Sequence, residues 1–281
     1  MDTRMIATAT TVVALSAIGI CRAARDPNEP ACTMPVGTSQ SACPQQQIEP
    51  NDPVEAILNQ LHGKTSELKS YEGMVEYKRI QPVLESESLR KGVLYFAKFG
   101  EKTRLRINFA TLRHDDEKEQ KYVEQFIFDG TWLTQIDYQI KAAKRYQLAE
   151  PNEPTDAFDL VSRNLPVVGF SKIQDLKKNF EIEMVEPQED KGDDLTHLHL
   201  TVKPGSVHED DYVYVDFWID RKLGLPARVL ALSTEEDIYE IRLLQPKVNR
   251  KIDAKVFDFE IPKGFGEPEI VPLKKKGKQA D

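Results

Sequence analysis

The sequence has few of the residues and motifs by which enzymes are recognised. Only three of its 281 residues are cysteine. It contains no Gly-x-Ser-x-Gly elbow and no glycine-rich loop of the kind that holds phosphates. Carboxylates are plentiful, but a glycoside hydrolase needs two that face each other across a cleft, and sequence alone cannot place them. We therefore expect a protein that is not an enzyme, with a hydrolase as the alternative.

A basic excess and an internal repeat are also missing. The formal net charge is −8, which does not favour nucleic acid as a partner. No period of 20 to 50 residues recurs, which excludes a solenoid or propeller. Hydrophobic residues make up 40% and charged residues 30%, as in soluble globular proteins. The length fits one large β domain or two small ones.

The apolar run at residues 5–20 falls short of the roughly 20 residues that a membrane-spanning helix needs. Arg4 precedes it, and small residues follow Cys21. This is the arrangement of a secretory signal over residues 1–24, which predicts an exported, periplasmic protein. Lipid attachment at Cys21 is the alternative, and Ile20 disfavours it because a small residue usually precedes a modified cysteine.

Two low-complexity segments flank the expected domain. Residues 25–52 are rich in Pro, Gln, Ser and Thr and predict a disordered linker. Cys32 and Cys43 lie within it, and export would allow either a local disulfide or two free thiols. Residues 273–281 carry four lysines and predict a solvated, disordered tail. The folded domain is expected at residues 53–272.

The domain opens with an amphipathic helix. Asp52 can cap it, and Pro53 suits its first turn. One apolar stripe follows at helical spacing: Val54, Ile57, Leu58, Leu61 and Leu68. We expect this stripe to cover a sheet.

Most of the remaining chain alternates between apolar and polar residues, as strands do. The expected strands are residues 71–77, 89–98, 103–109, 121–128, 131–138, 142–148, 180–186, 195–203, 212–219, 226–233, 238–245 and 256–261. Two helical segments, 154–164 and 170–179, interrupt the series, and residues 112–120 read as a solvated loop. About a dozen antiparallel strands with one apolar face predict a barrel or a strongly curved sheet, with a helix on its concave side.

One pair of residues has the spacing of a metal site. His197 and His199 share a strand face, so both imidazoles could reach one ion. Thr196, Leu198 and Leu200 form the apolar face of that strand, which leaves the histidines on the polar side. Because a third ligand is missing, we favour an exposed strand face and predict no metal or cofactor.

Four short stretches, in this order, resemble the LolA-like periplasmic carriers of outer-membrane lipoproteins. Residues 126–133 look like the family's strand, Asp-Gly turn and strand, and residues 157–164 occupy the place of its lid helix. Residues 220–226 look like a turn between two late strands. Residues 256–264 look like the closing strand, with its aromatic-x-aromatic-x-x-Pro-x-Gly pattern.

This resemblance implies an α+β fold. It consists of an unclosed antiparallel β-barrel of about 11–12 strands, with an N-terminal helix and a helical lid on the concave side. It implies a monomeric carrier of lipid or lipoprotein acyl chains, with an inner-membrane releasing complex and an outer-membrane acceptor as partners. A buried CH₂ contributes about 0.8 kcal/mol, so a chain of roughly fifteen carbons gains on the order of 12 kcal/mol before costs. The alternative is an envelope sensor or assembly module that has the same fold without lipid.

The apolar strand faces and the helical insert supply candidate site residues. We expect the cavity to be lined by Val75, Leu94, Phe96, Leu105, Ile107, Phe126, Phe128, Trp132, Ile136 and Phe217. The lid is expected to contribute Phe158, Val161, Val168 and Phe170. In one respect the chain departs from the family pattern: where carriers often have Arg-Pro, it has Phe99 after Lys98, and Phe99 cannot make the bonds that lock the lid.

Overall fold

The computed structural model describes residues 52–100, 102–150, 173–186 and 194–273, which all belong to one compact unit, Ile48–Asp281. The predicted signal peptide, the three cysteines, almost all of the linker and the four lysines of the tail lie outside these residues. The lid residues Phe158, Val161, Val168 and Phe170 lie outside them too. None of the helices in the described ranges is long and apolar enough to cross a membrane.

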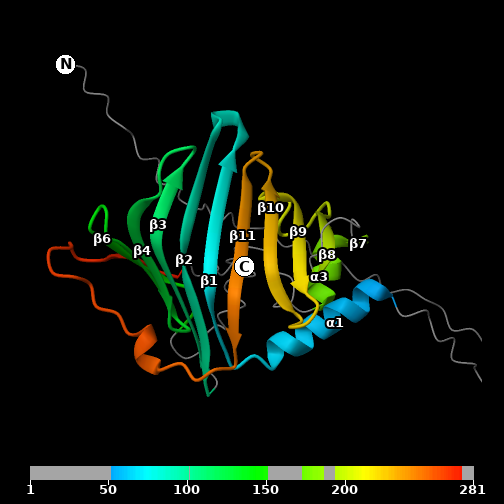
Figure 1. Cartoon of the computed structure of the whole chain (residues 1–281), viewed down its shortest axis with the longest axis horizontal. Coiled ribbons are helices and arrows are strands. Elements are labelled where there is room, and N and C mark those ends of the chain that lie inside the picture. The colour runs from blue at the N-terminus through cyan, green and yellow to red at the C-terminus, as the bar shows by residue number, and fades with distance from the viewer. Residues whose placement is uncertain (1–51, 101, 151–172, 187–193, 274–281) are drawn as a thin grey trace, which may run out of the picture. The chain divides into compact units, whose positions relative to one another are not determined.

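Twelve strands form one sheet in the order β12-β6-β5-β4-β3-β2-β1-β11-β10-β9-β8-β7 (Figure 1). Their bounds are β1 Ser70–Gln81, β2 Ser86–Phe99, β3 Lys102–His114, β4 Gln120–Phe128, β5 Trp132–Asp137, β6 Ala142–Gln147, β7 Phe180–Val185, β8 Leu195–Val202, β9 Tyr212–Asp220, β10 Leu225–Ser233, β11 Ile238–Val248 and β12 Glu269–Val271. Neighbouring strands are antiparallel except β12 and β6, which run parallel. The sheet is two meanders joined where β1 pairs with β11.

The end strands β7 and β12 do not pair with each other, so the sheet stays unclosed. This confirms the predicted α+β class with an unclosed, mainly antiparallel barrel. Eleven of the twelve strands fall where alternation predicts them, because each presents one apolar face to a core.

Helix α1, Pro53–Ser66, begins where the sequence predicts. The Asp52 carboxylate accepts a hydrogen bond from the Val54 backbone N–H at 3.0 Å, which satisfies one free donor of the first turn. Val54, Leu58 and Leu61 are buried and pack on the β8–β10 part of the sheet. A short helix, α3 at Ile173–Asn179, adds Leu176 to the same cluster. Figure 1 shows α1 lying beside β8–β10, far from β3–β6.

The strand register divides the side chains between two faces, because cross-strand partners share a face and successive residues alternate. We call the face that carries α1 the inner face and the opposite one the outer face. Phe217 packs with α1, and register places Val75, Phe96 and Phe128 on the same inner face.

The last part of the chain corrects one prediction. Residues 256–261 do not form a strand: a 3-10 turn at Ala254–Phe257 is followed by irregular backbone. Phe259, Ile261 and Phe265 pack on a small outer-face core of Ile127, Ile136 and Ala143. The alternation that suggested a strand reflects this covering role. The last strand is β12. It begins eight residues after the end of the segment 256–261, which we expected to close the sheet.

The loop predicted at residues 112–120 is also shorter than expected. Strand β3 continues to His114 and β4 begins at Gln120, so only the five residues between them form the connection. Leu112 lies on the inner face and is buried, which explains why the strand continues into this charged stretch.

Candidate functional site

The inner face has two halves with different cover. Over β7–β10, α1 and α3 enclose a cluster that includes Leu198, Val215 and Phe217, all fully buried. Phe217, a predicted cavity residue, is therefore core beneath a helix. Among the described residues, no helix covers the inner face of β1–β5. That half is where a ligand could lie.

The lower part of the β1–β5 half is well packed. Phe96 and Phe128 are almost fully buried, and Leu105 lies between them on β3. The register sets these three side chains side by side, since Phe96 lies opposite Leu105 and Leu105 opposite Phe128. All three were predicted as cavity lining, and the structure places them in a buried cluster on the inner face.

The next row up is less covered. Leu94 lies opposite Ile107, which lies opposite Phe126, and each is only half-buried. The predicted residue Val75 and its neighbour Phe109 border the row and are buried. Phe126 meets Phe109 edge to face, with ring centroids 6.2 Å apart. Leu94, Ile107 and Phe126 therefore form an apolar row, three strands wide, with exposed surface.

Above the apolar row the inner face becomes polar. Arg79 contacts Asp237 through Nη2 and Oδ2 at 2.6 Å, and Arg90 contacts Glu124 through Nη1 and Oε2 at 3.3 Å. Tyr77 lies on the same face, and burial raises the pKa of its hydroxyl. The inner face thus runs from an apolar floor to a rim of paired charges and a phenol.

Glu124 is the most enclosed charged residue of this rim, with 3% of its surface exposed. Its Oε1 accepts a hydrogen bond from Gln135 Nε2 at 2.8 Å. Burial raises the pKa of its carboxyl, and nearby Arg90 and the Gln135 hydrogen bond oppose that rise only in part. A carboxyl in this state can serve as a hydrogen-bond donor more readily than an exposed one.

Two predicted cavity residues lie on the wrong face. Phe128 pairs with Leu133, so Leu133 shares the inner face and Trp132 points outward. Ile136 has the same parity as Trp132 and is fully buried in the outer-face core. Trp132 lies 4.9 Å from the Arg145 guanidinium carbon, measured from its ring centroid. Their predicted place in the cavity is therefore wrong.

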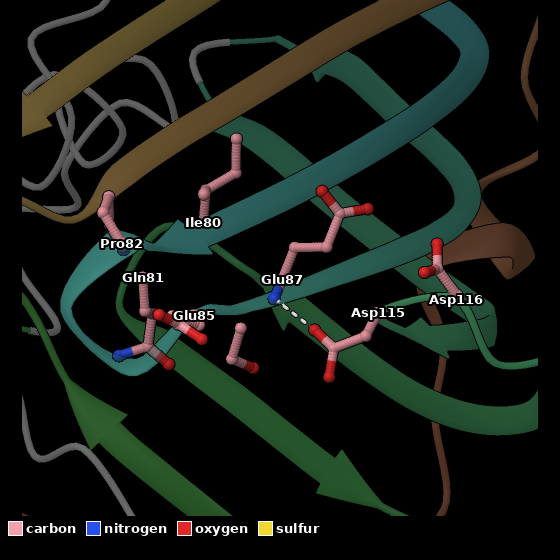
Figure 2. Close-up of a pocket in the computed structure, with 8 residues that line it drawn as sticks. Ile80, Gln81, Pro82, Glu85, Glu87, Asp115 and Asp116 are labelled. Carbon is pink, nitrogen blue, oxygen red and sulfur yellow. Dashed lines mark hydrogen bonds between the residues drawn. The ribbon is translucent and has the colours of Figure 1, made fainter.

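Two small pockets among the described residues include none of the predicted lining residues. One has a volume of about 270 Å³ and lies at the β1–β2 tip. Figure 2 shows Glu85, Glu87, Asp115 and Asp116 among its lining residues. The Glu87 backbone N–H donates to Asp115 Oδ1 there at 2.6 Å. The other, of about 250 Å³, lies between α1 and the loop after β9.

His197 and His199 lie on the outer face, as the apolar pattern of their strand predicts. His197 Nε2 and His199 Nδ1 both contact Asp216 Oδ1 at 2.8 Å. His197 also stacks on Trp218, with ring centroids 4.3 Å apart. In the part of the chain that the structure describes, no group of three or more histidine, cysteine or acidic residues is arranged to hold a metal ion.

The departure at Phe99 has a structural counterpart. Phe99 meets Phe257 edge to face at 5.7 Å on the outer side, so it anchors the C-terminal segment. Lys98 donates from Nζ to the Ser66 carbonyl oxygen at 2.9 Å, which ties β2 to the end of α1.

The sequence reasoning missed Tyr77, Arg90 and Glu124. One signal was available: Glu124 has the same strand parity as Phe126 and Phe128, so alternation already places it on the apolar side. A charged residue at such a position marks either a buried ion pair or a polar part of a site.

No family model matches this chain, and no curated protein matches it. Several solved structures match the chain at low sequence identity. A Pseudomonas aeruginosa MucA/MucB complex matches at 14% identity and a TM-score of 0.43, over 73% of this chain and 60% of that one. The Mycobacterium tuberculosis lipoprotein LppX matches at 13% identity and a TM-score of 0.42, over 70% of this chain and 96% of that one.

A LolA superfamily protein from Nitrosomonas europaea matches at 13% identity and a TM-score of 0.32, over 73% of this chain and 97% of that one. The chain spans only about three fifths of the MucB chains. At these identities and scores the matches carry no argument about this chain, and we take no ligand or partner from them.

Proposed function

We propose that this chain is an exported, periplasmic carrier that binds an acyl chain on the open half of its inner face and catalyses no reaction. The observation that supports it most is the half-buried row of Leu94, Ile107 and Phe126. Helices cover the other half of the same face, whereas among the described residues no helix covers this row.

The row has the dimensions that an acyl chain needs. Neighbouring strands lie about 4.8 Å apart, so three side chains in register make an apolar strip roughly 10 Å wide. Val75 and Phe109 extend it along the strands. Each CH₂ moved from water to this strip contributes about 0.8 kcal/mol, so even partial burial of a long chain favours binding.

The polar rim suits the other end of such a ligand. Arg90 and Glu124 offer donors and an acceptor next to the apolar row, and their charges balance. An ester or amide carbonyl could accept a hydrogen bond from the Arg90 guanidinium while its acyl chain lies toward Phe128. A neutral, hydrogen-bonding head group is the class that this rim fits best.

Native mass spectrometry tests the proposal directly. The full chain, exported by the expression host and purified without detergent, should carry an adduct of defined mass that lipid extraction identifies as acylated. Incubation of delipidated protein with a diacylated lipopeptide should restore the adduct. A clean apo mass together with no uptake of fatty acid or lipopeptide would contradict the carrier function.

An envelope interaction module is the second candidate. It is favoured by the dense packing of Phe96, Phe128 and Phe217, which leaves no room for a ligand at those three positions. In that case the chain should co-purify with a protein, and delipidation should leave this binding unchanged. Acyl uptake with no protein bound would instead exclude it.

A further inference from the structure

We propose that strand β7 is a docking edge that binds an extended, basic segment of a partner protein by strand addition. β7 ends the sheet, and among the described residues no strand pairs with the edge of β7 that faces away from β8. Its backbone N–H and C=O groups on that side are available to an added strand. The site lies in the half that α1 covers, so it is independent of the proposed acyl site.

The two ends of the sheet are not equivalent. β12 has three residues, too few to hold another strand firmly, and Lys144 and Glu269 join it to β6 with an Nζ–Oε2 distance of 3.0 Å. β7 has six residues, all paired with β8 on one side only. It therefore offers twice the length of free edge.

Side-chain exposure shows that the edge is open. From Glu181 onward, every residue of β7 is exposed except the half-buried Ile182. Met184 is 43% exposed and Val185 38%, although both are large apolar residues. Apolar side chains that remain exposed on a bare edge are typical of a surface that another chain covers.

Charge identifies the partner. Glu181 and Glu183 point to the outer face, and neither carboxylate has an ion-pair partner among the described residues. Ile182 and Met184 point to the inner face. An added strand with Lys or Arg opposite the two glutamates and Val or Ile opposite Ile182 and Met184 would complement both faces.

A second copy of the chain fits this edge poorly in the two registers that pair most of β7. In a twofold antiparallel pair, side chains on matching faces oppose each other, so an odd-numbered residue faces an odd-numbered one. A pair centred on Ile182 sets Glu181 against Glu183 twice, and one centred on Glu183 sets both copies of Glu183 together. Like charges directly opposite destabilise a strand pair. The same glutamates that oppose self-association favour a basic strand.

A charge swap tests the proposal. The probe is a short, amidated, fluorescein-labelled peptide of alternating lysine and valine, and its companion alternates glutamate and valine. Fluorescence anisotropy should show that the full chain binds the lysine peptide, and hydrogen exchange should slow at the amides of β7. The double variant E181K/E183K should bind the lysine peptide at least about tenfold more weakly and bind the glutamate peptide instead.

The matched control is E235K/E236K, which makes the same charge change in the exposed β10–β11 turn. It should bind the lysine peptide like the unchanged chain. Thermal unfolding checks that both variants fold. The proposal is overturned if the lysine peptide does not bind, if protection appears away from β7, or if both double variants weaken binding equally.

Discussion

Arg106 holds Val256 against the outer face of the sheet. Its Nη1 donates to the Val256 carbonyl oxygen at 2.7 Å and to the Asp258 carbonyl oxygen at 2.8 Å. Its Nε donates to Asn108 Oδ1 at 2.8 Å, which orients the guanidinium. One side chain of β3 thus satisfies two backbone acceptors of the irregular segment that replaces the expected last strand.

We therefore expect Arg106→Ala to destabilise the fold by about 2–3 kcal/mol, because two charge-assisted hydrogen bonds to the C-terminal segment are lost. Urea unfolding measures the loss, and proteolysis should become faster between residues 249 and 268. Arg104→Ala is the control. Arg104 reaches the exposed Asp258 carboxylate only at 4.0 Å, so its loss should cost less than about 1 kcal/mol. Equal losses would contradict the anchoring role of Arg106.

Gly92 marks a place where two strands come unusually close. A Cβ built at this position would lie 2.1 Å from the Asn108 carbonyl oxygen, at the bulge where the β2–β3 register shifts. Gly92→Ala should thus force the β3 backbone to move and cost about 2–3 kcal/mol or more. Gly63→Ala should instead stabilise by about 0.5–1 kcal/mol, because Gly63 is helical and its Cβ meets nothing within 4 Å. Thermal unfolding of the two variants should shift in opposite directions.

Glu124 should make the stability of the fold fall as pH rises. Burial raises the pKa of its carboxyl in the folded chain, so the folded state binds this proton more tightly than the unfolded state does. The resulting loss of stability begins near the unfolded pKa of about 4.3 and is complete above the raised folded pKa. Glu124→Gln removes the titration. Its stability relative to the unchanged chain should therefore improve as pH rises above the unfolded pKa of about 4.3.

Glu119→Gln should change the stability of the fold with pH in the opposite direction. The hydrogen bond from Lys91, at 2.8 Å, lowers the pKa of the Glu119 carboxyl, so its contribution is present above the unfolded pKa and is lost as pH falls. This variant should lose stability relative to the unchanged chain as pH rises, and the loss should shrink in high salt because the pair is exposed. Denaturant unfolding across pH measures both slopes. If the relative stabilities of the two variants changed with pH in the same direction, the raised pKa of Glu124 would be contradicted.

Alternation predicts the strands of this chain well because nearly all of them have one face in a core. It fails at residues 256–261, where Phe257, Phe259 and Ile261 also alternate but cover the outer face as irregular backbone. The apolar outer patch that they cover belongs to β4–β6. Such a patch can be recognised only when the strand register is known.

Register also explains why the candidate site was predicted only in part. Leu94, Ile107 and Phe126 were predicted on one face, and they lie on one face, because parity within one strand is enough to place them. Trp132 and Ile136 were misplaced because the parity of β5 depends on how Asp129 closes the turn: its carboxylate accepts from the Trp132 backbone N–H at 2.8 Å. That turn pairs Phe128 with Leu133 and so sets the faces of β5.

The acyl proposal makes a prediction at Ile107, the middle of the apolar row. Ile107→Gln places an amide among apolar side chains, so an acyl chain that covers it must remove that amide from water at about 1–3 kcal/mol. We expect acyl affinity to fall by about tenfold or more, measured by displacement of a fluorescent fatty acid. Because Ile107 is half-buried, the fold should tolerate the change.

Val93→Gln is the matched control for this experiment. Val93 is also half-buried and lies opposite Asn108, one residue along β3 from Ile107, but on the outer face. It should cost a similar amount of stability and leave acyl affinity unchanged. If both variants weakened acyl binding equally, the ligand would not lie on the inner face. If neither did, it would lie away from this row, and the proposed site would be wrong even if acyl binding itself were observed.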